Sequence, residues 1–450
     1  MVPTCRCALR CHHRVRLCHS RGATGKRCVR LPANPVNIII TAGYDTNFSV
    51  GFAKGLKAND LDFCVESCDE SSSRLTAAGI KNLNLRGSPD GNRSFFEKLT
   101  NLARYYVRLL ILIFRHRGAT VHFAGIFRNE FILLEGLFLN FYFRVLAGRY
   151  IYTVHNVLPH NREYSHFFRW IYRRIYRAPH ILLVHTERVR QQLIGDFGVP
   201  AGKIQLTSIG LNEEIPVTNI SRMEARRRLG FGEDEQIILF FGKIDVYKGL
   251  DILLEAFDLL AFPNVRLVIA GEYRNAVYRT QIHRQLERMS RRMDIHLYEQ
   301  FIPNDEAEVF FKASDVLCLP YRQIYQSGVA FLGSRFGIPL VTTDVGSLRE
   351  FVGDNFGIVT RSNDAIGIAD ALGRFFASPG RFSRSGIIDR AQKYRWASVC
   401  REFVSLYANE SSAADLSGVS QISDRGVCQS SDSRNMSDKK AMPEIRNHRL

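Results

Sequence analysis

Apolar residues along this chain gather into short runs that predict strands, and the segments between the runs carry the spaced apolar pattern of helices. A predominantly apolar run is typical of a strand buried on both faces of a parallel sheet. Such runs span residues 36–40, 119–123, 150–154 and 180–185, and then 236–241, 265–271, 295–298 and 315–320. Regular alternation of strand and helix predicts doubly wound parallel sheets, and a chain of 450 residues is long enough for two such domains.

The stretch 321–350 predicts a loop, a helix and a strand in sequence. The polar triplet QSG at 326–328 forms the turn, residues 329–336 suit a helix, and residues 340–343 are rich in strand-forming side chains. A small-residue turn that opens a helix suits an anion, because free backbone N–H groups and the positive end of the helix dipole point at it. The same pattern also fits an ordinary strand-to-helix turn, so it does not assign a ligand alone.

Two other predicted strands end in polar side chains. The strand at 236–241 is followed by a basic turn and an amphipathic helix at 250–260, and the strand at 150–154 ends in a polar pair. In parallel α/β sheets, the carboxyl ends of the strands border the crevice where ligands bind. The residues concerned are Lys243 and Lys248 after the first of these strands, and His155 and Asn156 after the second.

These three stretches, in this order, resemble the retaining glycosyltransferases of family 4, the "glycosyl transferases group 1" type, which have the GT-B fold. The matching residues are YTVHNVLPH, FFGKIDVYKGLDILLEAF, FIPNDEAEVFFKASDVLCLPY and QSGVAFLGSRFGIPLVTTDVGSLRE. The resemblance covers roughly residues 36–408. It implies two Rossmann-like parallel-sheet domains that face each other across a cleft, and it says nothing about the particular sugar.

The resemblance also implies a division of the chain. We expect a disordered basic extension at 1–34, an acceptor domain at 36–205, a nucleotide-sugar domain at 206–395, a helix at 396–408 that crosses back to the first domain, and a disordered tail at 409–450. The tail is rich in Ser, Asp and Lys and poor in apolar residues, which is typical of disorder.

Residues of both expected domains acquire roles from the resemblance. His155 is the expected catalytic histidine, Lys243 and Lys248 are expected to bind the donor diphosphate by charge, and Ser327 and Gly328 to offer it backbone N–H groups. Further expected contacts to donor or acceptor are Gly43, Asn156, Gln326 and Glu350.

One departure from the family pattern concerns the ribose of the donor. Many members carry two glutamates near the QSG turn, and the second binds the ribose hydroxyls. Ile324 and Leu332 stand at these two positions here. A subgroup with a similar QSG turn also lacks the acidic pair, so activity is retained as the expectation. The ribose contact must then come from elsewhere, and Glu350 is the nearest acid on the loop.

The formal net charge of +17 favours an anionic partner. Its cations are interleaved with apolar helices and form no recognisable nucleic-acid motif, so we expect no nucleic acid partner. Predicted helices at 101–117, 131–149 and 166–177 combine arginines with aromatic and aliphatic residues. This pattern is typical of helices that lie on anionic membranes, and it also fits helices that pack on a sheet beneath a solvated arginine rim. We expect a cytoplasmic protein, peripheral at the inner face of the cell membrane.

The first 34 residues hold five of the ten cysteines and the motifs CHH and CH. Their spacings match none of the usual zinc-finger patterns, so we expect no metal there. The segment has no apolar core of the kind found in secretory signals.

The expected reaction moves a sugar from a nucleoside-diphosphate sugar to a glycan or lipid-linked acceptor, in cell-surface polysaccharide or glycolipid synthesis. No carboxylate suited to a double displacement stands out, and in similar enzymes the leaving phosphate deprotonates the acceptor. We expect no metal and no cofactor, because lysines neutralise the diphosphate. Two alternatives are a non-catalytic GT-B protein that binds a membrane or partner, and a nucleotide-sugar epimerase of the same fold.

Overall fold

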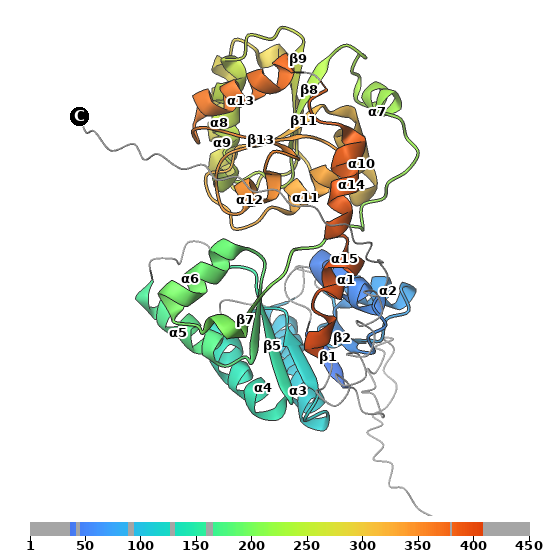
Figure 1. Cartoon of the computed structure of the whole chain (residues 1–450), viewed down its shortest axis with the longest axis vertical. Coiled ribbons are helices and arrows are strands. Elements are labelled where there is room, and N and C mark those ends of the chain that lie inside the picture. Colours follow the sequence, from blue (N-terminus) through green and yellow to red (C-terminus); the bar gives the residue numbers. More distant parts are fainter. Residues whose placement is uncertain are drawn as a thin grey trace, which may run out of the picture. The chain divides into compact units, whose positions relative to one another are not determined.

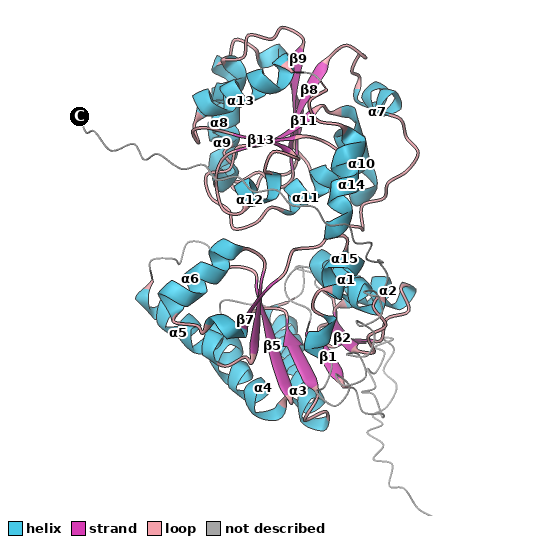
Figure 2. Cartoon of the chain, in the orientation of Figure 1, coloured by secondary structure: helices cyan, strands magenta, loops and turns pink. Residues whose placement is uncertain are grey.

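The computed structural model describes residues 37–41, 46–88, 94–126, 131–158, 165–378 and 380–407. The expected extension at 1–34, the expected tail at 409–450 and Gly43 lie outside these described residues. Two parallel sheets follow one another along the chain, and each is flanked by helices (Figures 1 and 2). The expected α/β class with two parallel-sheet domains is confirmed.

The first sheet has seven strands in the order β3-β2-β1-β4-β5-β6-β7, and every pairing is parallel. The strands are β1 (Ile38–Thr41), β2 (Cys64–Ser67), β3 (Asn82–Asn84), β4 (Thr120–Phe123), β5 (Arg149–Val154), β6 (Ile181–Val184) and β7 (Ile204–Leu206). The strand order reverses between β1 and β4, which places a topological switch point at their carboxyl ends.

Helices cover both faces of this sheet because its central strands are apolar on both sides. The helices α3 (Phe95–Arg115), α4 (Asn140–Leu146), α5 (His166–Arg177) and α6 (Glu187–Phe197) share one buried core with the sheet. On the other face, Phe52 of α1 (Thr46–Lys57) contacts His122 of β4 at 5.2 Å between ring centroids. The helix α2 (Asp69–Ala77) follows β2.

The expected helix at 131–149 is wrong in its middle and at its end. Residues Leu134–Leu139 form a π-helix, α4 follows and stops at Leu146, and β5 already begins at Arg149. Glu135 is buried in the π-helical segment, where its carboxylate accepts a hydrogen bond from the Tyr106 hydroxyl. The Asn140 side chain donates to the Glu135 carbonyl at 3.3 Å. Such side-chain bonds offer the backbone an alternative to the regular α-helical ladder.

The second sheet has six parallel strands in the order β10-β9-β8-β11-β12-β13. They are β8 (Gln236–Phe241), β9 (Val265–Ala270), β10 (Ile295–Tyr298), β11 (Val316–Leu319), β12 (Leu340–Thr342) and β13 (Gly357–Val359). Alternate residues of each strand enter two separate cores, as the period of two in a strand dictates. The order reverses between β8 and β11, which sets a second switch point.

The two cores of the second sheet belong to two sets of helices. The helices α8 (Leu250–Asp258), α9 (Ala276–Arg288) and α13 (Ala365–Ala377) cover one face, and the others cover the opposite face. The second set is α7 (Arg222–Leu229), α10 (Asn304–Ala313), α11 (Gly328–Arg335), α12 (Leu348–Val352) and α14 (Arg384–Ala391). Short 3-10 turns occur at Ala201–Lys203, Val246–Lys248, Arg292–Asp294, Gln392–Tyr394 and Val404–Tyr407.

The chain then returns to the first sheet with α15 (Trp396–Arg401), drawn in red beside the blue α1 in Figure 1. The helix expected at 396–408 is shorter than predicted, because α15 ends at Arg401 and a 3-10 turn follows.

Candidate functional site

A tight basic turn follows β8 and brings a lysine back to the end of that strand. Gly242 and Gly249 border the turn with φ of +93° and +68°, a region that favours glycine. A Cβ on Gly249 would lie 2.0 Å from the carbonyl oxygen of Pro320, so the turn packs directly on the chain after β11. The Asp245 carboxylate accepts the Val246 N–H at 2.8 Å and caps the 3-10 turn that contains Lys248.

Lys248 is buried, with 6% of its surface exposed. Burial, the largest cause, acts together with the nearby charges of Arg274 and Lys243, and against that of Asp245, to lower the pKa of its amine to about 8. The ammonium lies 5.9 Å from the centre of the Tyr321 ring. Lys243 and Arg274 therefore both lie close enough to act on the charge of Lys248, and the sequence predicted the two lysines but not Arg274.

An ion pair outside the turn holds it in place. The Arg322 guanidinium donates to both carboxylate oxygens of Asp251, at 2.7 and 2.5 Å, and to the Val246 carbonyl at 3.0 Å. The Tyr278 hydroxyl donates to the same carboxylate at 2.7 Å. Arg322 and Tyr278 thus tie the turn to the first residues of α8 and to α9.

The QSG turn opens α11 as predicted. Ser327 is buried, and its hydroxyl accepts the Ala330 N–H at 3.2 Å, which makes it the N-cap. Gly328 is exposed, and no heavy atom lies within 4 Å of the place where its Cβ would be. The open space before this helix end gives an anion room to approach the backbone N–H groups.

His155 follows β5, and its ring is held by three neighbours. Its Nε2 donates to the Ala124 carbonyl at 3.1 Å, so the neutral form of this ring has Nδ1 as its acceptor. Phe48 lies edge-to-face at 4.6 Å between ring centroids, and His185 lies at 5.4 Å. His122 is fully buried, and His185 is partly exposed although both of its ring nitrogens are buried. Desolvation lowers the pKa of each to about 3, so both stay neutral.

Residues of both sheets line one cavity of about 500 Å³. His155 and Asn156 contribute from the first domain. The second domain contributes Lys243, Lys248, Gln326, Ser327 and Gly328. Gln326 adds a buried Oε1 that has no hydrogen-bond partner among the described residues. The structure therefore brings seven of the sequence-predicted site residues together.

One of the predicted site residues that the structure describes stands apart from this cavity. Glu350 is exposed on α12 and is not among the residues that line it. Gly43 lies outside the described residues. Ile324 and Leu332, which replace the acidic pair of many family members, do line the cavity and make that part of its wall apolar.

The cavity is also lined by residues that were not predicted as site residues from the sequence. Glu272, directly after Gly271 at the end of β9, is the one acidic side chain among the described residues that line the cavity. Its place at the carboxyl end of a strand next to the switch point is a signal that could have found it. Asn47, Phe48, Asn212 and Trp396 carry no comparable local signal, and they too line the cavity.

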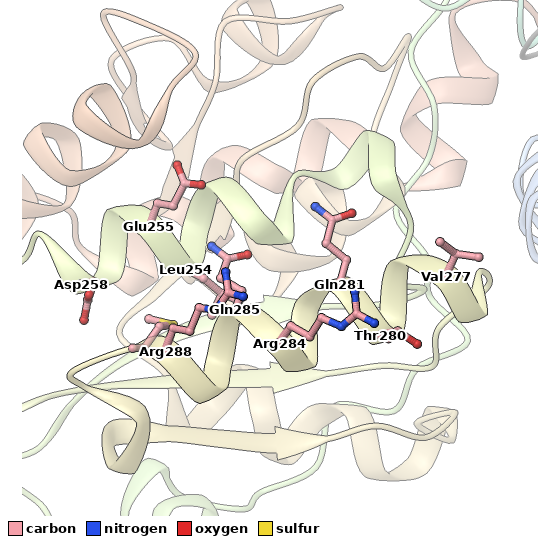
Figure 3. A pocket seen from close by; sticks show the side chains of 10 residues that line it. Leu254, Glu255, Asp258, Val277, Thr280, Gln281, Arg284, Gln285 and Arg288 are labelled. Carbon is pink, nitrogen blue, oxygen red and sulfur yellow. The ribbon is translucent and has the colours of Figure 1, made fainter.

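A larger hollow of about 830 Å³ lies elsewhere, between α8 and α9. Figure 3 shows Leu254, Glu255 and Asp258 on one side of it, and Gln281, Arg284, Gln285 and Arg288 on the other. None of the predicted site residues lines it, so its size does not make it the functional site.

Two family models match the chain in succession. Residues 48–214 match "Glycosyltransferase Family 4", and residues 221–394 match "Glycosyl transferases group 1". Among curated proteins, a D-inositol 3-phosphate glycosyltransferase of Xylanimonas cellulosilytica is 26% identical over 242 residues, which cover 51% of this chain and 57% of the relative. One from Mycolicibacterium gilvum is 30% identical over 221 residues, covering 48% and 49%. The chain thus spans about half the length of the curated relatives it matches.

Solved structures resemble the chain over most of its length. Sucrose-phosphate synthase from Thermosynechococcus elongatus superposes with a TM-score of 0.64 at 18% identity, covering 85% of this chain and 99% of that one. Anabaena HepE in complex with UDP-glucose gives 0.64 at 13% identity, covering 85% and 100%. The two parallel-sheet domains, with their switch points, define a GT-B fold. Within that class, the chain belongs to the group 1 glycosyltransferases, also called family 4.

Proposed function

We propose that this protein transfers a sugar from a nucleoside-diphosphate sugar to a hydroxyl group of a glycan or lipid-linked acceptor, with retention at the anomeric carbon. The observation that carries the proposal is the single cavity, which His155 lines together with a cationic turn and the opening of α11. The HepE structure with bound UDP-glucose supports the class of donor, because that protein shares the fold of this chain.

The cationic side of the cavity suits a diphosphate. Lys243 and Lys248 supply positive charge, and the N-terminal N–H groups of α11 supply donors without further reorganisation. A charge that is buried, as in Lys248, acts on a bound anion with little screening by solvent. These groups stabilise the negative charge that grows on the leaving diphosphate, and no metal is needed for that step.

In the proposed transfer, the bond between the anomeric carbon and the diphosphate oxygen breaks while a bond to the acceptor oxygen forms on the same face. The acceptor proton passes to an oxygen of the leaving phosphate. The protein contributes position and charge stabilisation. His155, with Nδ1 as an acceptor and its ring held by Ala124 and Phe48, positions a hydroxyl group of the sugar or the acceptor.

Glu272 supplies the acid that the QSG region lacks. Ile324 and Leu332 cannot bind ribose hydroxyls, whereas the Glu272 carboxylate can accept two hydrogen bonds from adjacent hydroxyls. Glu350, which the sequence analysis named as the nearest acid on the loop, does not line the cavity. We therefore assign the hydroxyl contact to Glu272.

The acceptor class and location belong to the same proposal. A structural neighbour, WaaG, is described as a glycosyltransferase involved in lipopolysaccharide biosynthesis, and it superposes with a TM-score of 0.56 at 15% identity. No helix of the part of the chain that the structure describes is long and apolar enough to span a membrane. A role in polysaccharide or glycolipid synthesis, as a peripheral protein on the cytoplasmic face of the membrane, fits both observations.

A panel of UDP-, GDP- and ADP-sugars tests this proposal, with release of nucleoside diphosphate as readout and crude membrane lipid as acceptor. Lys248→Gln should lower kcat/KM by about two orders of magnitude or more, because a transition-state charge loses its partner. His155→Ala should lower turnover while the affinity for the free nucleotide stays unchanged. Glu272→Gln should weaken the affinity for nucleotides. Arg284→Gln, which removes an exposed cation outside the cavity, is the matched control.

Turnover by Lys248→Gln equal to that of the unchanged protein would contradict the assigned site.

The second candidate function is a non-catalytic protein with the same fold. The apolar Ile324 and Leu332 in the cavity wall are the observation that favours it. Such a protein would bind no nucleoside diphosphate at micromolar concentration and would release none from any donor.

A further inference from the structure

Large apolar side chains are exposed on neighbouring helices that cover one face of the first sheet. Along the chain these helices are α3, the π-helical segment that continues into α4, and α5, and each contacts the next in space (Figure 1). Their inner stripes share one buried core with the sheet. Their outward residues form what we call the α3–α5 surface: Phe96, Leu99, Val107, Ile111, Phe114, Leu133, Phe138, Phe141, Val145, Phe167 and Trp170.

Most of the surface of several of these apolar side chains is exposed to water, which is unfavourable unless another molecule covers them. Phe96 is 78% exposed, Phe141 67% and Val145 61%. Single exposed apolar residues are ordinary, but neighbouring ones that share a surface mark a place where something else binds. The inner stripes already satisfy the packing of the helices on the sheet, so the outer residues are not needed for the fold.

The charge of the α3–α5 surface is strongly positive. Neither α4 nor α5 contains an acidic residue, and α3 has Glu97 as its one acid. The cations on these helices are Lys98, Arg104, Arg108, Arg115, Arg144, Arg169, Arg173, Arg174 and Arg177. Arg174 lies over the Trp170 ring at 4.9 Å, so cations and rings are interleaved on the same helix.

This combination of groups selects the occupant. Aromatic rings and aliphatic side chains enter the boundary between headgroups and acyl chains, while arginines meet anionic headgroups. A second copy of the chain would place like charges opposite each other, which is unfavourable. A nucleic acid would match the arginines but would leave Phe141 and Val145 without an apolar partner.

We propose that the α3–α5 surface lies on an anionic lipid bilayer. The inference deepens the membrane location in the proposed function, because it names the surface and the lipid class, and its test does not depend on sugar transfer. The surface carries its apolar groups as side chains of folded helices, so the contact is interfacial and leaves the core of the first domain intact.

Sedimentation with vesicles tests the proposal. The full chain should bind phosphatidylcholine vesicles that contain about a third phosphatidylglycerol, bind pure phosphatidylcholine vesicles weakly, and be released in part by high salt. Each cation near an anionic surface contributes about a fivefold factor in binding. Arg104→Glu with Arg174→Glu, which removes two cations and adds two anions, should therefore lower binding at least about twenty-five-fold. Phe141→Ser with Trp170→Ser should lower binding to the same vesicles and should leave less of it resistant to salt.

Matched controls come from exposed residues of the second domain. Arg284→Glu with Arg288→Glu makes the same charge change, and Val277→Ser with Ile366→Ser makes the same kind of polar change. Neither pair should alter vesicle binding by more than about twofold. Affinity for UDP or GDP should be equal in all variants, which separates failure of this inference from failure of the proposed function.

Three results would overturn the inference. The first is absence of binding to anionic vesicles by the unchanged protein. The second is an equal loss of binding in the surface variants and the controls, which would indicate a response to net charge alone. The third is a dimer in solution that the Phe141→Ser and Trp170→Ser changes abolish, which would assign the surface to a second copy.

Discussion

Lys248 shows how a single residue acquires its properties from its place in the fold. A lysine in a basic turn is ordinarily a solvated cation, and the sequence predicted its charge but not its burial. The positive φ of Gly249 and the contact of this glycine with Pro320 fold the turn back on the sheet. The amine then lies against the Tyr321 ring, and burial lowers its pKa to about 8.

We predict that the affinity for UDP or the matching nucleoside diphosphate depends on pH through Lys248. The amine is protonated below about pH 8 and neutral above it, and only the protonated form attracts the diphosphate. The dissociation constant should rise above pH 8, by up to about tenfold per pH unit, until the higher pKa of the complex is passed. Isothermal titration between about pH 6.5 and about pH 9.5 measures it.

Lys248→Met is the control for this prediction, because it should bind the nucleotide weakly and without that rise. The folded pKa lies below the unfolded value of 10.5, so the buried ammonium opposes folding. The cost is complete below about pH 8 and vanishes above pH 10.5. Lys248→Met should therefore raise the free energy of unfolding at pH 7, by up to about 3 kcal/mol. A flat binding profile in the unchanged protein would contradict the assigned role.

At the scale of elements, the contact between α1 and α15 depends on glycines. A Cβ on Gly51 would lie 2.0 Å from Trp396 Nε1, and one on Gly55 would lie 2.5 Å from the Trp396 carbonyl oxygen. Trp396 in turn meets Phe48 edge-to-face at 5.1 Å, and Phe48 meets His155 at 4.6 Å. The packing of α15 on α1 therefore affects the position of His155, because the rings of Trp396 and Phe48 lie between them in contact.

Gly51→Ala should lower the free energy of unfolding by about 1–3 kcal/mol, because a bulky indole must move to admit one methyl group. Urea denaturation measures the change. The matched control is Gly195→Ala in α6, where the glycine is exposed and no heavy atom lies within 4 Å of the added Cβ. That change should be neutral or should stabilise by up to about 1 kcal/mol, since it restricts the unfolded chain. Equal effects of the two substitutions would contradict the close packing of α1 on α15.

At the scale of the whole molecule, histidines that stay neutral in the fold and a large positive charge both lower the stability of the folded state in acid. His122 Nε2 forms a hydrogen bond of 2.7 Å with Thr153 Oγ1 inside the first domain, and the His185 ring lies beside that of His155. Both have a pKa of about 3 in the fold, against the ordinary histidine value of 6.5. The net charge of +17 at pH 7 grows as histidines of the unfolded chain titrate.

We predict that the protein loses stability on mild acidification. Below pH 6.5 His122 and His185 become protonated in the unfolded chain, whereas in the folded chain they stay neutral down to about pH 3. Stability should fall as pH falls, by up to about 1.4 kcal/mol per pH unit for each histidine. Urea denaturation at about pH 7.5 and about pH 5.5 measures the difference. His122→Asn, which keeps a polar group but no titrating ring, should show a smaller dependence on pH. An unchanged slope in this variant would contradict the prediction.

Much of the fold followed from patterns that are local in sequence. β8 and β10 have the predicted bounds, and α5 spans the predicted residues 166–177, because an apolar run or a helical stripe is visible within a short window. The segment β2–α2–β3 was not predicted. The strand Cys64–Ser67 mixes an acid and a serine with two apolar residues, and a buried ion pair of Glu66 with Arg86 satisfies it only in the folded domain.

The functional residues divide in the same way. His155, the lysine pair and the QSG turn could be recognised from sequence because each follows its own strand, and the ends of parallel strands meet at one edge of a sheet. Asn212 and Trp396 could not, since their relation to the cavity depends on packing between segments that are remote in the chain. Glu272 also follows a strand, so the same rule could have found it. The burial of a side chain depends on many residues that pack around it, and so does the resulting shift in its pKa. The sequence could therefore predict the charges of the basic pocket but not the burial of Lys248.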